Sequence, residues 1–271
     1  MQNLKQKAII SLKKKGYFVF KSFFSEKYID NLNAQLSKLK PLKQSSFFKK
    51  GSSDAKIIFN LQSKHKVFLN LLNNEIINLI NTKFLNDKNY KGINQKLPNY
   101  ILSQYVARSS GKNRCDVHID DKSPNQSDTA NYLQWAIPMI DLNTKNGCTQ
   151  LLEKSHLNLK RKKYKKSLRN FKDLILKKGD LAVWDGSILH TARPNKTNKT
   201  RWVIILTYAR WFFKPHYDIP RNFPKKFYKY LDNKKKIILG FASIPKSSEK
   251  IGTYQRGNLK TADNFIKNRI F

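Results

Sequence analysis

Residues 134–152 read QWAIPMIDLNTKNGCTQLL, an apolar run followed by a polar turn and a second short apolar run. The Asn146-Gly147 pair in the turn favours a two-residue hairpin, because both residue types tolerate the positive φ angles that such turns need. We therefore expect a β-strand at 134–142 and a returning strand at 148–152.

Similar short strands are expected on both sides of this stretch. Residues 99–109 (NYILSQYVARS) and 201–211 (RWVIILTYARW) read as strands, and Gly179-Asp180 turns into a shorter strand at 181–184. A series of short strands separated by turn signals indicates a jelly roll rather than alternating βαβ units. In such a fold, residues that are far apart in the sequence meet at one open end of the barrel.

Helices are expected to flank this core. Residues 3–40 predict two helices around a strand at 17–20, with Ser25 as N-cap of the second helix. Residues 67–84 predict one further helix with a broad apolar face. Such helices would cover the outer side of a barrel sheet. The fold class is therefore mainly β with flanking helices and a double-stranded β-helix core of the jelly-roll or cupin-like type.

The whole chain of 271 residues is predicted to be one domain. Residues 1–95 would form a helical support, residues 96–212 the jelly-roll core, and residues 213–271 an extension that packs on the core. Three polar loops are expected to cover the mouth of the barrel, at residues 41–64, 121–131 and 157–172.

His118, Asp120 and His190 are the candidate metal ligands. Two imidazoles and one carboxylate on neighbouring strand ends can hold Fe(II) on one face. Three coordination positions then stay open for a bidentate oxo acid and O2. Arg201 follows His190 after a short connection and is placed to bind the far carboxylate of 2-oxoglutarate.

Five stretches resemble, in the same order, the phytanoyl-CoA dioxygenase family of Fe(II)- and 2-oxoglutarate-dependent oxygenases. They are residues 12–36 (LKKKGYFVFKSFFSEKYIDNLNAQL), the His118-Ile119-Asp120 element, residues 146–156 from NGC to SH, Gly179-Asp180 leading to His190, and Arg201. The resemblance extends over about residues 10–212. It implies that the two histidines and Asp120 bind iron. It also implies that Arg201 pairs with the C5 carboxylate of 2-oxoglutarate, which the planar, permanently charged guanidinium suits.

Other positions of the resemblance bear on the co-substrate. Trp135 aligns with a tryptophan that the family places at the cofactor pocket. Ala192 stands where the family often has a hydroxyl residue that helps to bind 2-oxoglutarate. Two alternatives follow: either Gln104 or Tyr105, on the preceding strand, replaces this donor, or the affinity for 2-oxoglutarate is lower. Glu153-Lys154 replaces the family's proline-glycine pair, which alters a loop.

The resemblance implies an enzyme with Fe(II), 2-oxoglutarate and O2 as cofactors that hydroxylates an aliphatic carbon. Asp120 argues against a halogenase, because related halogenases have a small residue there so that halide can bind. Two alternatives stay open at this point: a nucleic-acid dealkylating oxygenase, and a noncatalytic basic binding module on the same barrel.

The chain carries 54 Lys and Arg against 18 Asp and Glu, a net charge of +36. Such an excess creates a field that attracts anions, and the basic residues are densest at 160–166 and 225–236. We expect a small anionic substrate, free or linked to an acidic carrier or a glycan; an anionic surface or a nucleic acid would also fit the charge.

The two cysteines, Cys115 and Cys148, predict no disulfide framework and a reducing, cytoplasmic compartment. No stretch approaches the roughly 20 apolar residues of a transmembrane segment.

Overall fold

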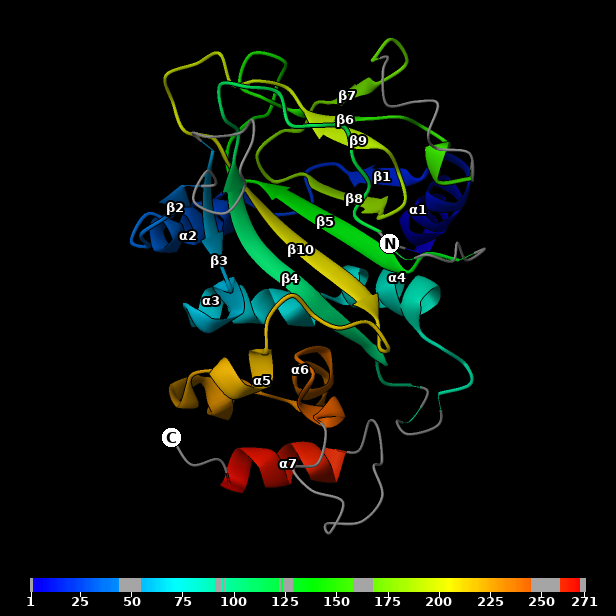
Figure 1. Cartoon of the computed structure of the whole chain (residues 1–271), viewed down its shortest axis with the longest axis vertical. Helices are drawn as coiled ribbons and strands as arrows, with labels where there is room; N and C mark the ends of the chain where they lie inside the picture. The colour runs from blue at the N-terminus through cyan, green and yellow to red at the C-terminus, as the bar shows by residue number, and fades with distance from the viewer. Residues whose placement is uncertain are drawn as a thin grey trace. The chain divides into compact units, whose positions relative to one another are not determined.

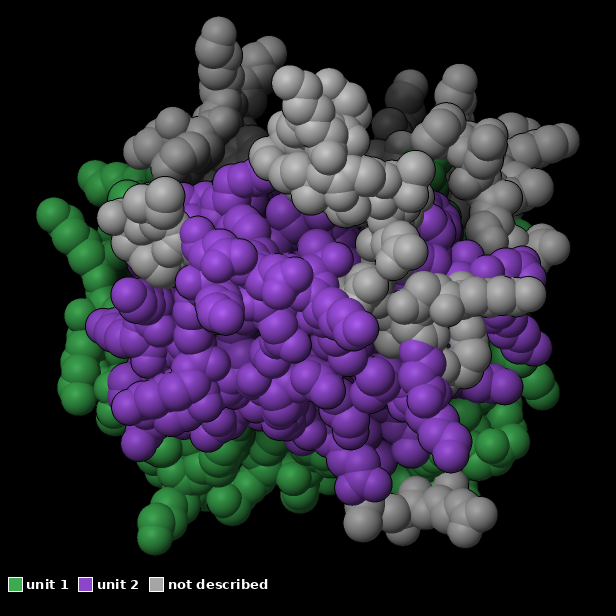
Figure 2. All heavy atoms as spheres, turned by 90° about the horizontal axis from the view of Figure 1, so that it is seen from below, with its two compact units in different colours: residues 1–61, 105–207 green, residues 62–104, 208–271 purple. Residues whose placement is uncertain are grey.

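The computed structural model describes residues 2–43, 55–90, 94, 96–121, 123, 129–157, 168–244 and 259–268. They belong to two compact units, the first of residues 1–61 and 105–207 and the second of residues 62–104 and 208–271 (Figure 2). The basic cluster at 160–166 lies outside the described residues, as do parts of the three predicted loops. The division of the chain into one domain with three parts stays a prediction.

A seven-stranded sheet carries most of the β-structure (Figure 1). Its strands, in spatial order, are β1 (Tyr17–Phe20), β8 (Leu181–Asp185), β5 (Tyr132–Pro138), β10 (Trp202–Arg210), β4 (Tyr100–Ser109), β3 (Lys56–Phe59) and β2 (Leu42–Lys43). The pairs β1–β8, β5–β8 and β3–β4 are antiparallel. The strands expected from the sequence are therefore present, with ends shifted by a few residues.

A smaller sheet in the first unit completes the core. It contains β7 (Lys172–Leu174), β6 (Thr149–Leu151) and β9 (His190–Ala192), all antiparallel. Side chains of both sheets form one buried apolar cluster, which includes Ala136, Leu151, Leu174, Trp184 and Val203. Two antiparallel sheets that share a core, with helices beside them, confirm the predicted jelly-roll class.

The first two helices follow the sequence prediction. They are α1 (Gln2–Lys15) and α2 (Glu26–Leu36), on either side of β1. The hydroxyl of Ser25 accepts a hydrogen bond of 3.3 Å from the backbone N–H of Tyr28, so Ser25 is the N-cap as predicted. The apolar residues of α2 that repeat at helical spacing, Ile29, Leu32 and Leu36, are buried.

The prediction of a single helix at 67–84 is wrong in one respect, because the structure has a break within this segment. The structure has α3 (Lys66–Asn70), the 3-10 turn η3 (Leu71–Asn73) and α4 (Glu75–Leu85). Asn74 lies outside helical geometry, and its side chain accepts from the backbone N–H of Ile77 at 3.1 Å. An asparagine that caps a new helix interrupts an apolar pattern that is otherwise continuous.

The turn at Asn146-Gly147 is also different from the prediction. It does not join two paired strands, because β5 belongs to the large sheet and β6 to the small one. Asn143 and Asn146 close the turn through hydrogen bonds between their side chains and each other's backbone N–H groups. The turn therefore carries the chain from one sheet to the other. The strand β3, within a segment predicted to be a polar loop, is a second difference.

The second unit contains the C-terminal part of the chain. Its helical segments are α5 (Ile219–Asn222), η6 (Lys225–Tyr230), α6 (Asn233–Ile238), η7 (Phe241–Ser243) and α7 (Leu259–Asn268). Asp232 caps α6 and forms an ion pair of 2.8 Å with Lys235, which is buried. No helix among the residues that the structure describes is long and apolar enough to cross a membrane.

Candidate metal centre

The backbone brings His118, Asp120 and His190 together in the first unit. His118 and His190 form an antiparallel β-bridge, in which each backbone N–H donates to the other residue's carbonyl oxygen at 3.0 and 2.9 Å. The N–H of Asp120 donates to the carbonyl of Gly186 at 2.9 Å. These bonds tie the loop after β4 to β9 and to the turn after β8, so two distant parts of the sequence meet at one place.

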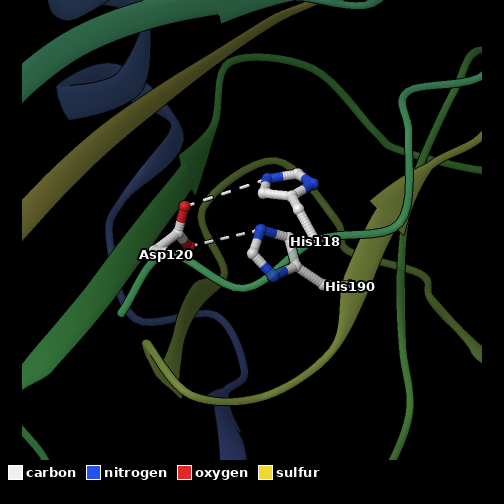
Figure 3. Close-up of side chains that lie close together, drawn as sticks. All are labelled: His118, Asp120 and His190. Atoms are coloured by element: carbon white, nitrogen blue, oxygen red, sulfur yellow. Dashed lines mark ion pairs between the residues drawn. The ribbon is translucent and has the colours of Figure 1, made fainter. Parts of the chain in front are cut away.

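The three side chains point toward one another (Figure 3). The Nε2 atom of His118 lies 3.8 Å from Oδ1 of Asp120, and Nε2 of His190 lies 3.3 Å from Oδ2. One ligand atom from each residue lies within 4.8 Å of the other two. Ligands about 2.1 Å from a metal and at right angles to each other are separated by about 3 Å. The spacing therefore fits a metal ion after a small adjustment of the side chains.

The two histidines are held with the same nitrogen turned toward Asp120. Nδ1 of His118 lies 2.7 Å from the carbonyl oxygen of Asp116, and Nδ1 of His190 lies 3.1 Å from that of Ile188. A backbone carbonyl can only accept, so each Nδ1 carries the proton and donates. Each Nε2 then keeps its lone pair for a metal. Two such nitrogens and one carboxylate are a donor set that suits Fe(II).

Gln134 of β5 supports the carboxylate. Its amide nitrogen donates to Oδ2 of Asp120, and its amide oxygen accepts from the hydroxyl of Thr207 on β10 at 3.3 Å. Gln134 and Thr207 are both buried, so this chain of hydrogen bonds is shielded from solvent. Gln134 did not stand out in the sequence, because a glutamine in an apolar strand carries no motif.

We expect the Gln134→Leu variant to bind metal about 10- to 100-fold more weakly than the wild type. Leucine has a similar volume but cannot orient the carboxylate of Asp120. The measurement is a calorimetric titration of the purified protein with Mn(II). Gln150→Leu is the matched control, since Gln150 is equally buried but bonds Arg114 instead of a triad residue. Equal metal affinities of the two variants would contradict the role of Gln134.

Arg201 is a buried guanidinium without a carboxylate partner among the described residues. Its side chain is only 5% exposed, and burial lowers the pKa of the guanidinium to about 10, so it stays charged at neutral pH. One terminal nitrogen donates to the hydroxyl of Ser110 at 2.7 Å and to the carbonyl of Gly147, while Nε has no hydrogen-bond partner. A buried cation with spare donors is suited to an anion, and above all to a carboxylate.

Ser110 and Gly147 are site neighbours that the sequence did not reveal. Gly147 has φ +89°, and a Cβ there would lie 2.4 Å from the hydroxyl oxygen of Ser110. Only glycine therefore allows the backbone to come this close to Ser110 and Arg201. The Ser110 hydroxyl also lies 3.3 Å from the carbonyl oxygen of Arg193, next in sequence to Ala192.

Trp135 lies away from the triad. It follows Gln134 in β5, and successive residues of a strand point to opposite faces. Since Gln134 points to Asp120, Trp135 points to the other face, where its ring stacks at 6.2 Å on that of Phe20. The structure thus places Trp135 in the apolar core, and we do not include it in the proposed cofactor site.

Gln104 and Tyr105 lie on opposite faces of β4. Tyr100 shares a face with Gln104 and packs against Tyr208 of β10 with ring centroids 5.6 Å apart. Thr207, one residue earlier in β10, points the opposite way, toward the triad side of the sheet. Of the two alternative donors, Gln104 therefore faces away from this side and the buried Tyr105 faces it.

A cavity of about 550 Å³ lies in the second unit, which does not contain the triad. Its wall is mostly apolar and aromatic, with Trp211, Phe212 and Leu239 among the lining residues. None of the predicted site residues lines it.

The sequence matches the model of the phytanoyl-CoA dioxygenase (PhyH) family over residues 12–203. The chain belongs to this family. The iron and 2-oxoglutarate predicted from the sequence are therefore the cofactors of the chain's own family, whose members also use O2. The donor set and the buried Arg201 fit this chemistry. No functionally curated protein matches the sequence.

Solved structures with the PhyH-like fold match at low sequence identity. HygX from Streptomyces hygroscopicus, with nickel and 2-oxoglutarate bound, has a TM-score of 0.62 and 12% identity; the match covers 78% of this chain and 89% of HygX. The epimerase SnoN of nogalamycin biosynthesis has a TM-score of 0.60 and 14% identity, over 78% and 84% of the two chains. The carbocyclase SnoK of the same biosynthesis has a TM-score of 0.58 and 16% identity, over 77% and 85%. At these identities the likeness shows the fold alone.

Proposed function

We propose that this PhyH-family protein is a hydroxylase that oxidises an aliphatic carbon of a small anionic substrate, free or linked to a carrier or glycan. The observation that carries the proposal is the triad of His118, Asp120 and His190, with both Nε2 atoms turned toward one carboxylate. When bound there, Fe(II) with 2-oxoglutarate would supply the oxidising power for attack on an unactivated C–H bond.

The side chains of this protein have separate tasks in the proposal. His118, Asp120 and His190 hold the metal on one face, and Gln134 keeps the carboxylate of Asp120 in place. Arg201 binds the far carboxylate of 2-oxoglutarate, with Ser110 and Gly147 fixing the position of its guanidinium. His190 is buried while His118 and Asp120 are partly exposed, so in this proposal the substrate approaches the metal from the side of His118 and Asp120.

Relatives with this fold act on or bind small molecules. HygX has been crystallised with hygromycin B, and SnoN with nogalamycin RO. The named reactions of SnoN and SnoK are an epimerisation and a ring closure. Epimerisation and ring closure are therefore alternatives to the proposed hydroxylation, and the experiment must separate the three reactions.

The experiment measures succinate formed from 2-oxoglutarate by the Fe(II)-loaded protein, with pooled anionic metabolites as substrates. Mass spectrometry of the metabolite that stimulates turnover then identifies the reaction. A gain of one oxygen atom supports hydroxylation, an unchanged mass indicates epimerisation, and a loss of two hydrogen atoms indicates ring closure. Absence of iron-dependent succinate formation with every pool would count against an oxygenase.

We expect the positive charge to accelerate the capture of an anionic substrate. Lys226, Lys229 and Lys234 are exposed in the C-terminal segment. Changing all three to glutamine should lower kcat/KM at low salt, and the wild-type advantage should shrink as ionic strength passes the physiological value, where the Debye length is about 8 Å. Turnover of 2-oxoglutarate without substrate should change little, because the buried Arg201 is screened far less. Parallel, salt-insensitive curves for both proteins would contradict an anionic substrate.

A cytoplasmic location is part of the proposal. Cys115 and Cys148 are both free thiols in the structure, which is consistent with a reducing compartment.

A further inference from the structure

Trp184 of β8 has a buried indole N–H without a hydrogen-bond partner among the residues that the structure describes. The residue is only 3% exposed, so water does not satisfy the donor from the surface. Buried polar groups in native proteins are almost always paired, because an unpaired buried donor costs free energy. An orphan donor of this kind needs an explanation, and one explanation is a bound molecule.

The indole lies on the same face of the large sheet as the metal centre. Trp184 is directly opposite Gln134 in the antiparallel β5–β8 pair, and residues so paired point to the same face. The side chain of Gln134 reaches Asp120. The ring of Trp184 lies 5.9 Å from the ring of His190, at an angle of 57°. Trp184 is therefore beside the proposed metal ligands.

Three polar neighbours of Trp184 among the described residues already have partners. Gln134 donates to Asp120 and accepts from Thr207. Tyr17, opposite Trp184 on β1, donates its hydroxyl to Glu153 at 2.9 Å. The Nδ1 of His190 faces a backbone carbonyl, and its Nε2 faces Asp120. None of these groups accepts from the indole.

We propose that Trp184 is a ligand-binding residue of the metal centre, and that its indole N–H donates to an oxygen of the small molecule bound beside His190. The inference rests on the proposed function, which supplies such a molecule. Two sources share this chemistry: a water that completes the metal's coordination, and a carboxylate oxygen of 2-oxoglutarate. Trp184 was not among the residues that the sequence suggested, where Trp135 stood out instead.

The first test observes the indole protons of the wild-type protein by NMR. The chain has four tryptophans, so four indole N–H signals are expected and single Trp→Phe variants assign them. Zn(II), which is diamagnetic, is added first and 2-oxoglutarate second. We expect the signal of Trp184 to move, while that of Trp135 on the opposite face stays. A new hydrogen bond shifts an indole proton downfield, so a downfield shift with Zn(II) alone identifies water as the acceptor, and a downfield shift only after 2-oxoglutarate identifies the oxo acid.

The second test measures affinity. Trp184→Phe keeps an aromatic ring but loses the donor, and Trp135→Phe is the matched control for removing a buried indole. If the oxo acid is the acceptor, Trp184→Phe should bind 2-oxoglutarate about tenfold more weakly in the presence of Mn(II), and the control should bind it like the wild type. If water is the acceptor, the loss should appear in the affinity for Mn(II) alone. Thermal unfolding of both variants shows whether they fold alike.

The results of the two tests distinguish a failure of the Trp184 inference from a failure of the proposed function on which it rests. Should the wild type bind metal and 2-oxoglutarate while the Trp184 indole signal stays in place, the inference is wrong and the metal centre stands. The NMR test needs no substitution at Trp184 beyond signal assignment, so a poorly folding variant does not decide the result. A wild type that binds neither metal nor 2-oxoglutarate would overturn both the proposed function and this inference.

Discussion

The His190→Ala variant is expected to lose 2-oxoglutarate turnover down to background and to bind Fe(II) far more weakly than the wild type. His190 supplies one of the three candidate metal ligands, and it is the buried one. Alanine removes the Nε2 donor, and two ligands hold a divalent metal much less well than three. The same loss is expected for His118→Ala and Asp120→Ala. The measurements are calorimetric metal titration and succinate formation.

Folding should survive the loss of His190. Its backbone bonds with His118 do not involve the side chain, so the bridge that closes the site is retained. His216→Ala is the matched control, because His216 lies in the second unit, beside the cavity there. We expect this control to keep wild-type turnover. Full activity of the His190→Ala variant would rule out the assignment of the metal ligands.

The Arg201→Lys variant is expected to need about ten- to a hundredfold more 2-oxoglutarate for half-maximal turnover, which corresponds to about 1.5–3 kcal/mol. Lysine keeps a positive charge but loses the planar fork that binds a carboxylate with two parallel hydrogen bonds. The site also disfavours charge, since burial already lowers the pKa of Arg201 to about 10. A buried lysine, whose ordinary pKa is lower, would give up part of its charge as well.

The measurement is the dependence of succinate formation on 2-oxoglutarate concentration at saturating Fe(II). Metal affinity should stay unchanged in Arg201→Lys, which distinguishes the loss of an anion site from damage to the triad. Arg221→Lys is a suitable control, because Arg221 forms an exposed ion pair with Asp218. An unchanged 2-oxoglutarate dependence in Arg201→Lys would place the carboxylate anchor elsewhere.

The meeting of His118, Asp120 and His190 was predictable from the residues alone. The spacing of His118, Asp120 and His190, together with a series of short strands, predicted that the His118–Asp120 element and the distant His190 would meet. The chemical reason is that imidazole and carboxylate side chains have a distinctive preference for divalent metals. Arg201 was proposed by the same logic, because a guanidinium can bind a carboxylate with two parallel, charge-assisted hydrogen bonds.

The surroundings of these residues were not predictable in the same way. Trp135 and Trp184 both lie in apolar strands. The alternation of side chains along a strand shows which residues share a face, but it does not show which of the two faces lies near the metal ligands. Which face carries the candidate metal ligands depends on strand pairing. The register that sets Gln134 opposite Trp184 and stacks Trp135 against Phe20 comes from contacts between distant segments.

Local sequence signals failed where tertiary contacts were stronger. Asn146-Gly147 has the composition of a hairpin turn, yet the strands before and after it join different sheets. Residue types with strong chemical preferences, the triad and Arg201, therefore indicated a candidate site from the sequence. The faces, the register and the orphan indole of Trp184 were decided only by the tertiary structure, because they arise from pairing between strands that no local stretch encodes.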